Sequence, residues 1–208
     1  MPAYFSVSFE LNKNKNAIQE FYASLMRFGF LLNSRHYDEN DSINKIIEWN
    51  RNKLNSDYEY GLNDPYWVDY KQILFEFQGF SEIWVCITNR RKKPTFRISL
   101  IIPEDDFVEF EEIDGKFIVN EHKEKMDVIK DLAKSVWNDM EILAIQTSWE
   151  CTLDYPPDAK EILKGEKPLC EPICIIKNTS AVKKVGLHFE EIGKGGVLLE
   201  DFDNWNYM

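Results

Sequence analysis

Seven apolar residues between Glu121 and Met140 recur three or four positions apart, which is the spacing of one face of an α-helix. They are Met126, Ile129, Leu132, Ala133, Val136, Trp137 and Met140. A helix with one continuous apolar stripe and a polar opposite face needs an apolar surface to cover. We therefore expect a long helix over residues 121–140 that packs on one face of a β-sheet.

The strands of such a sheet are indicated by apolar residues at every second position. The opening residues 3–11 alternate in this way, and Glu82–Thr88 is apolar on both faces, as is typical of an interior strand. The segment Thr95–Ile102 also alternates, and we expect four of its side chains to face the core, namely Phe96, Ile98, Leu100 and Ile102. Because the polar run Asn89–Pro94 separates two of these strands, we expect it to form the loop of a β-hairpin.

Shorter helices are expected in three further places. One runs from Ile18 to a stop at Gly29, and a second covers Ser42–Leu54 with Asp41 as its cap. A third begins at Pro157, reaches Leu163 and is closed by Gly165.

The remaining segments read as strands joined mostly by hairpins. They include residues 73–75 and 117–119, the latter after an Asp114-Gly115 turn, and residues 141–150, 173–177, 182–190 and 197–200. With no internal repeat and no low-complexity linker, we expect residues 1–208 to form a single α+β domain. Its core is a mainly antiparallel β-sheet with one long helix and two or three shorter helices packed on it.

The segment Glu104–Asp114 carries seven carboxylates and no basic residue in eleven positions. Phe107, Val108, Phe110 and Ile113 lie among the acids. Clustered negative charge repels itself and favours water, whereas the apolar residues attach the segment to a folded core. We expect an exposed acidic surface between the hairpin and the long helix.

The net charge of −11 narrows the classes of partner. A surface of this sign repels nucleic acid and anionic membranes and attracts cationic proteins, although solubility alone also favours acidic residues. The N-terminus has no signal-peptide pattern and no run reaches the length of a membrane span, so we expect a cytoplasmic protein. The four-residue basic run Arg90–Lys93 is expected to be a solvated hairpin tip.

Residues that carry out catalysis or bind metals are sparse. His36, His122 and His188 are far apart, and Cys170 and Cys174 lack zinc-ligand spacing, so we expect no metal site and no cofactor. Cys151 is the one thiol that merits a test as a nucleophile. The glycine-rich run Gly193–Gly196 lacks the spacing of a phosphate loop and is expected to be a hairpin turn.

Three functions remain open. The first is a non-catalytic binding or inhibitor protein that presents its acidic surface to a basic protein partner such as a toxin domain. The partner-binding residues would be Glu104, Asp105, Asp106, Phe107, Glu109, Phe110, Glu111, Glu112 and Asp114. The second is a small hydrolase-type enzyme with a carboxylate- or Cys-containing cleft, and the third is a homodimeric scaffold or regulatory subunit.

The C-terminal third bears a family resemblance in three pieces: the strand end Trp149-Glu150, Tyr155-Pro156-Pro157 with its short helix, and the closing run Gly195–Leu199. In these pieces the chain resembles bacterial polymorphic-toxin immunity proteins. The resemblance implies a small intracellular α+β protein that neutralises a cognate toxin without catalysis.

Overall fold

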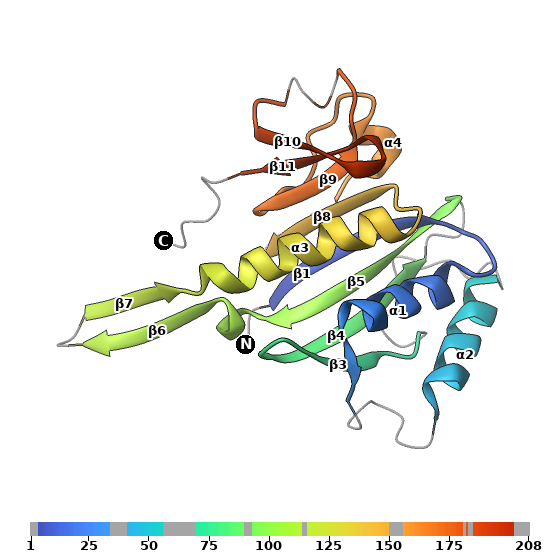
Figure 1. The fold of residues 1–208 in the computed structure, drawn as a ribbon, viewed down its shortest axis with the longest axis horizontal. Coiled ribbons are helices and arrows are strands. Elements are labelled where there is room, and N and C mark those ends of the chain that lie inside the picture. Colours follow the sequence, from blue (N-terminus) through green and yellow to red (C-terminus); the bar gives the residue numbers. More distant parts are fainter. Residues whose placement is uncertain are drawn as a thin grey trace, which may run out of the picture.

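Nine strands form one sheet in the computed structural model, which describes residues 4–33, 41–55, 70–89, 93–113, 116–149, 156–180, 182 and 185–201. The strand order is β10-β11-β9-β8-β1-β5-β4-β3-β2, and all neighbouring strands are antiparallel (Figure 1). The strands are β1 (Tyr4–Asn12), β2 (Leu31–Leu32), β3 (Ile73–Phe77), β4 (Phe80–Asn89), β5 (Thr95–Pro103), β8 (Ala144–Trp149), β9 (Ile173–Lys177), β10 (His188–Ile192) and β11 (Gly196–Glu200). A separate pair, β6 (Val108–Ile113) and β7 (Lys116–Glu121), completes the strands.

The helices α1 (Ala17–Phe28), α2 (Ile43–Asn55) and α3 (Lys123–Asp139) contribute to one large core with the inward side chains of the sheet. All seven residues of the predicted stripe are buried, six on α3 and Met140 directly after it, as are the four inward residues predicted for β5. The prediction of an α+β fold with a mainly antiparallel sheet is therefore confirmed.

A second, smaller core lies on the opposite face of the sheet at its C-terminal end. Alternate residues of β9 divide between the two cores, since Ile175 belongs to the large one and Cys174 and Ile176 to the small one. The short helix α4 (Ala159–Ile162) covers this second core with Ala159 and Ile162. Both faces of the sheet are thus covered at this end, which explains the continuous apolar runs in β9 and β11.

The strand predicted over residues 182–190 is present, but its predicted start is wrong. The strand is β10 and begins at His188, whereas Val182 packs into the small core ahead of it. Gly186 between them has a φ of 82°, a backbone conformation that interrupts a strand. The strand expected over residues 141–150 begins later, at Ala144, and the two-residue strand β2 was not predicted.

Two predicted helix starts are also wrong, the Asp41 cap and the opening of a helix at Pro157. Ser42, rather than Asp41, begins α2, because its carbonyl oxygen accepts the Ile46 amide at 3.1 Å and Asp41 instead forms an ion pair with Lys71. Asp158, rather than Pro157, begins α4 through a reciprocal capping box with Glu161. In both cases the pattern located the helix but not the side chain at its start.

The glycine-rich run forms the predicted hairpin turn between β10 and β11, with a 3-10 turn over Gly193–Gly195. Trp137 of α3 donates a hydrogen bond from Nε1 to the carbonyl oxygen of Gly193 at 2.9 Å. The turn is thus fastened to the long helix, a contact made across fifty-six positions of sequence.

No helix among the described residues is both long and apolar enough to span a membrane.

Candidate functional site

The acidic segment begins as a 3-10 turn, Glu104–Asp106, and continues into β6. Its side chains fall into two groups. Asp105, Glu109, Glu111 and Glu112 are exposed and Glu104 is half-buried, whereas Asp106 and Phe107 are buried. The expectation of an exposed acidic surface is therefore wrong at Asp106, whereas the burial of Phe107 agrees with the expectation that the apolar residues attach the segment to a folded core.

Asp106 is a structural carboxylate with a full set of partners. Its oxygens accept the Ser81 amide at 3.0 and 3.1 Å and the Ser81 hydroxyl at 2.9 Å, and Lys125 Nζ lies 3.0 Å away. Lys125 also donates to the carbonyl oxygen of Gly79 at 3.1 Å. The side chain thus joins α3 to the turn before β4, and its charge is not available to a partner protein.

Phe107 belongs to a cluster of aromatic rings under the start of β6. Its ring centroid lies 4.8 Å from that of Phe5, 5.6 Å from Phe80 and 5.7 Å from Trp149. The Phe107 carbonyl oxygen accepts the His122 amide at 2.8 Å, which ties the start of β6 to the end of β7. The base of this strand pair is therefore firmly attached to the large core.

Beyond this base, β6 and β7 project from the body of the molecule as an arm (Figure 1). Phe110 lies in β6 opposite Val119 of β7, and Asp114 lies outside the described residues. The backbone register sets Glu109 opposite Asn120, Glu111 opposite Ile118 and Glu112 opposite Phe117. No lysine or arginine of β7 therefore lies directly opposite these three glutamates, and Lys116 is opposite Ile113.

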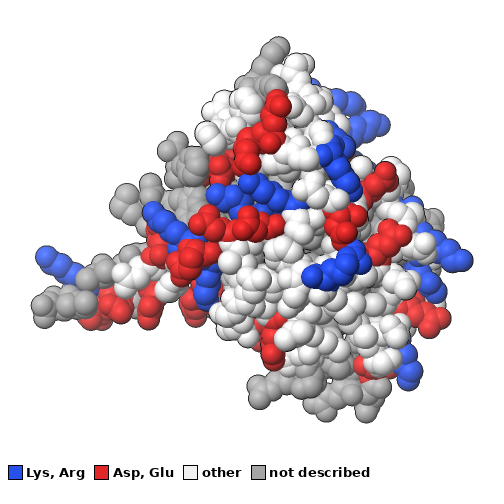
Figure 2. All heavy atoms as spheres, in the orientation of Figure 1, with Lys and Arg blue, Asp and Glu red and all other residues white. Residues whose placement is uncertain are grey.

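Charge on the arm is less compensated than charge on the body. Among the described residues, the basic side chain that lies within 4.0 Å of the Glu109 carboxylate is the His122 imidazole, through Nε2, and no ion pair to Glu111 or Glu112 is found. In contrast, two lysines of α3 pair with the C-terminal hairpin, Lys130 with Glu200 at 2.7 Å and Lys134 with Glu190 at 2.7 Å. Figure 2 shows acidic side chains along the arm, with basic side chains at its outer end and near its base, and mixed charges where α3 adjoins β10 and β11.

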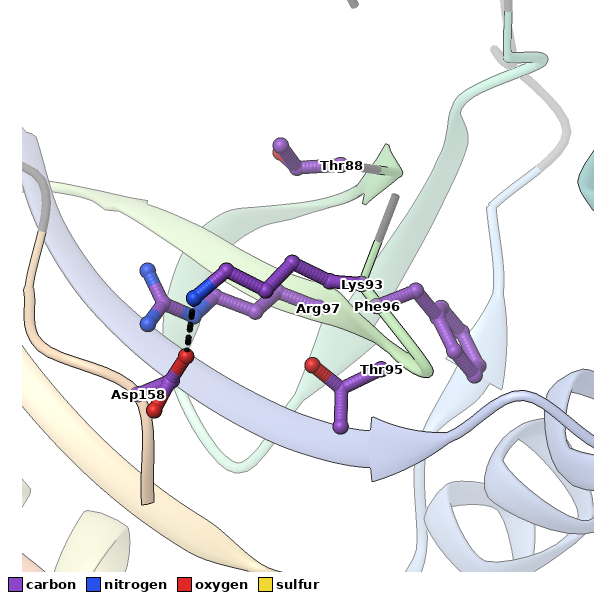
Figure 3. A pocket seen from close by; sticks show the side chains of 6 residues that line it. All are labelled: Thr88, Lys93, Thr95, Phe96, Arg97 and Asp158. Carbon is purple, nitrogen blue, oxygen red and sulfur yellow. Dashed lines mark hydrogen bonds and ion pairs between the residues drawn. The ribbon is translucent and has the colours of Figure 1, made fainter. Parts of the chain in front are cut away.

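A small pocket lies where β4 ends and β5 begins. It is lined by Thr88, Lys93, Thr95, Phe96, Arg97 and Asp158. Figure 3 shows the Lys93 ammonium pointing at the Asp158 carboxylate, with Nζ and Oδ2 2.6 Å apart. Arg97 donates from Nη2 to the carbonyl oxygens of Pro156 and Pro157 at 2.7 and 3.1 Å. Both cations are thus engaged with the chain itself, and the pocket is a joint that fastens the α4 region to the sheet.

The same joint contains a buried carboxylate on β1. Glu10 accepts the Ala159 amide at 2.8 Å, and Gln146 donates from Nε2 to the Pro157 carbonyl oxygen at 2.9 Å. Glu10 thus satisfies a buried backbone amide, and Gln146 shares the Pro157 carbonyl oxygen with Arg97. The remaining members of the predicted basic tip, Arg90, Arg91 and Lys92, lie outside the described residues.

Asp158 is expected to contribute about 1 to 2 kcal/mol to stability through its cap and its ion pair. Burial by itself raises its pKa, but hydrogen bonds from Lys93 and the Glu161 amide outweigh burial and lower the pKa below 3.8. A lowered folded-state pKa gives a contribution that is present above the ordinary value and lost as the pH falls through the lowered one. Urea unfolding should thus separate wild type from Asp158→Ala at neutral pH and much less once the pH is below the lowered pKa of Asp158.

Lys160→Ala, at an exposed position of the same helix, is the matched control and should unfold like the wild type at both pH values. An Asp158→Ala deficit that is equal at neutral and acid pH would show that the charge of Asp158 adds nothing to its role as a cap.

The described thiols are unreactive. Burial raises the pKa of Cys86 and of Cys170 to about 12 and that of Cys174 well above its ordinary value, so all three stay protonated near neutral pH. Cys151 and His36 lie outside the described residues. Within the described part of the chain, no group of three or more His, Cys, Asp or Glu side chains is placed to hold a metal ion.

The pieces that carry the immunity-protein resemblance lie at the C-terminal end of the fold. Trp149 ends β8, Pro156 and Pro157 precede α4, and Gly196–Leu199 belongs to β11, while Glu150 and Tyr155 lie outside the described residues. Comparison of the chain with protein-family models, with curated proteins and with solved structures finds no match. The resemblance therefore stays a prediction.

Proposed function

We propose that this protein is a non-catalytic, immunity-like binding protein of the cytoplasm, which presents the acidic arm to a basic protein partner such as a toxin domain. The observation that carries the proposal is the arm itself, which projects from the body and exposes Glu109, Glu111 and Glu112 with no base directly opposite any of them on the facing strand. Exposed charges of one sign raise the rate of encounter with an oppositely charged surface and orient it.

The geometry narrows the residues available to the partner. Asp106 and Phe107 support the arm from within, so the acidic contact surface comprises the half-buried Glu104 and the exposed Asp105, Glu109, Glu111 and Glu112. Charges this close to water contribute little to affinity, so these acids are suited to attracting the basic partner and aligning it on the arm.

The first probe is the C-terminal domain of any large secreted protein encoded by the adjacent reading frame. The protein is expected to form a complex with that domain and to suppress its toxicity in a co-expression assay. Reversal of charge in the triple variant Glu109→Lys/Glu111→Lys/Glu112→Lys should slow association about tenfold at low salt, because it removes the steering field. The difference should shrink as added salt screens the charges.

The matched control moves the same charge change to exposed glutamates on the body, in Glu20→Lys/Glu48→Lys/Glu166→Lys. This variant has the same net charge as the arm variant. If steering depends on the position of the charges on the arm, the control should associate faster than the arm variant. Equal association rates for the two variants would remove the arm from the interface and leave only the net charge.

A further inference from the structure

The arm has unpaired strand edges. Strands β6 and β7 pair with each other through six residue pairs, from Val108 opposite Glu121 to Ile113 opposite Lys116. They form a two-stranded sheet of their own and share no ladder with the nine-stranded sheet. The outer edge of β6 therefore has no partner strand among the described residues, and its outward backbone N–H and C=O groups can pair with an added strand.

The base of the arm holds this edge in a fixed direction. On the β6 side, Asp106 is bonded to Ser81 and Lys125 and Phe107 is buried, and on the β7 side α3 begins two residues after Glu121. A two-stranded sheet gains stability from a third strand, and an edge that is already oriented loses little entropy when that strand binds.

Charge along β6 distinguishes between the possible occupants of the edge. If a second copy of the chain paired its own β6 antiparallel to this one, glutamates of the two copies would be neighbours, an arrangement that destabilises a strand pair. Lysines or arginines on the added strand would instead lie beside Glu109, Glu111 and Glu112. The outer edge of β7 is the poorer site for a basic strand, because Lys116 is exposed on it and Lys123 follows it.

We infer that β6 accepts an extended basic segment of the partner as a third strand, paired to its outer edge by main-chain hydrogen bonds. The inference rests on the proposed function and specifies how that partner is recognised. Main-chain pairing supplies affinity and alignment, while the glutamates select a basic sequence over others of equal strand propensity.

The test uses two synthetic peptides of about ten residues that alternate Lys with Thr, a usual strand length. One is unmodified, and the other is N-methylated at every backbone nitrogen, which removes the N–H groups along both edges and leaves the charge unchanged. Fluorescence anisotropy should show the unmodified peptide binding at least about tenfold more tightly, because several main-chain hydrogen bonds are lost on methylation. Amide hydrogen exchange should slow at alternate residues of β6 only with the unmodified peptide.

The outcomes separate this inference from the proposed function. The two peptides could bind equally tightly and be weakened equally by the arm charge reversal. That result would overturn strand addition and leave an acidic arm that acts by charge alone. Binding of neither peptide would also overturn strand addition, while complex formation with the adjacent-frame domain judges the proposed function separately. Protection of β6 amides that grows with protein concentration without peptide would assign the edge to a second copy and overturn the inference.

Discussion

Replacement of Asp106 by Ala is expected to lower the free energy of unfolding by about 3 kcal/mol, because it removes one partner of a buried, hydrogen-bonded ion pair. The Asp106 side chain is only 7% exposed, and Lys125, with a side chain 23% exposed, is its ionic partner. Truncation leaves the Ser81 amide without an acceptor and the Lys125 ammonium without a counter-charge. Urea unfolding followed by circular dichroism measures the effect.

Asp105→Ala is the matched control, since Asp105 is adjacent to Asp106 in sequence but has an exposed side chain. It should change the free energy of unfolding by no more than about 0.5 kcal/mol. Asp106→Asn keeps the shape of the side chain and one acceptor oxygen, and we expect it to lie between the two alanine variants. A loss below about 1 kcal/mol for Asp106→Ala would mean that Ser81 and Lys125 find water or other partners without cost.

The stability of the arm's base also bears on the proposed interface. Asp106 and Phe107 lie directly before β6, so a change at either position alters how firmly the arm is held without altering its exposed charge. If a substitution at Asp106 slows association, the association rate should still depend on salt concentration as it does in the wild type. A substitution at Glu111 that slows association should weaken this salt dependence. This difference distinguishes a residue that positions the arm from one that contacts the partner.

Gly196→Ala is expected to lower the free energy of unfolding by about 2 to 3 kcal/mol, because the added methyl group overpacks a closed contact. A Cβ at this position would lie 2.5 Å from Trp137 Nε1 and 2.7 Å from Cε2. The indole is buried and cannot swing aside, since Nε1 is bonded to the Gly193 carbonyl oxygen and Lys177 Nζ lies 5.3 Å from the ring centroid. The midpoint and slope of a urea unfolding curve measure the loss.

Gly193→Ala, in the same turn, is the matched comparison. Its Cβ would meet Asn138 Oδ1 at 2.3 Å, but Asn138 is exposed and the end of its side chain can rotate away. We therefore expect a loss of less than about 1 kcal/mol for Gly193→Ala. If the Trp137 ring is the group that the added methyl group contacts, Trp137→Phe should lower the free energy of unfolding less in the Gly196→Ala background than in the wild type. Additive effects in that double-mutant cycle would contradict the proposed clash.

These glycines show how far the sequence leads. Their cluster predicts a hairpin turn, and the turn is present, with Gly195 at a φ of 65°. Gly193 and Gly196 serve a different need, because they let the turn lie against Asn138 and Trp137 of α3. Nothing local in the run separates the glycine required by backbone conformation from those required by close packing.

The acidic segment shows the same limit at the candidate site. The alternation of charge and apolar residues predicted a surface joined to a core, and the exposed side chains of Glu109, Glu111 and Glu112 agree with that prediction. Asp105 and Asp106 are adjacent and chemically equal, yet one is exposed and the other buried. The difference arises because Ser81 and Lys125, distant in sequence by twenty-five and nineteen positions, converge on Asp106 alone.

By itself the sequence determined most of the elements, because periodicities of two and of about 3.6 residues are local and follow from which side of a strand or helix must be buried. It predicted the stripe of α3, the inward face of β5 and the turn before β11. Only the tertiary structure decided which groups meet, such as Glu10 with the Ala159 amide across 149 positions. It also decided that β6 and β7 stand apart from the main sheet, since strand pairing depends on long-range contacts that no local pattern records.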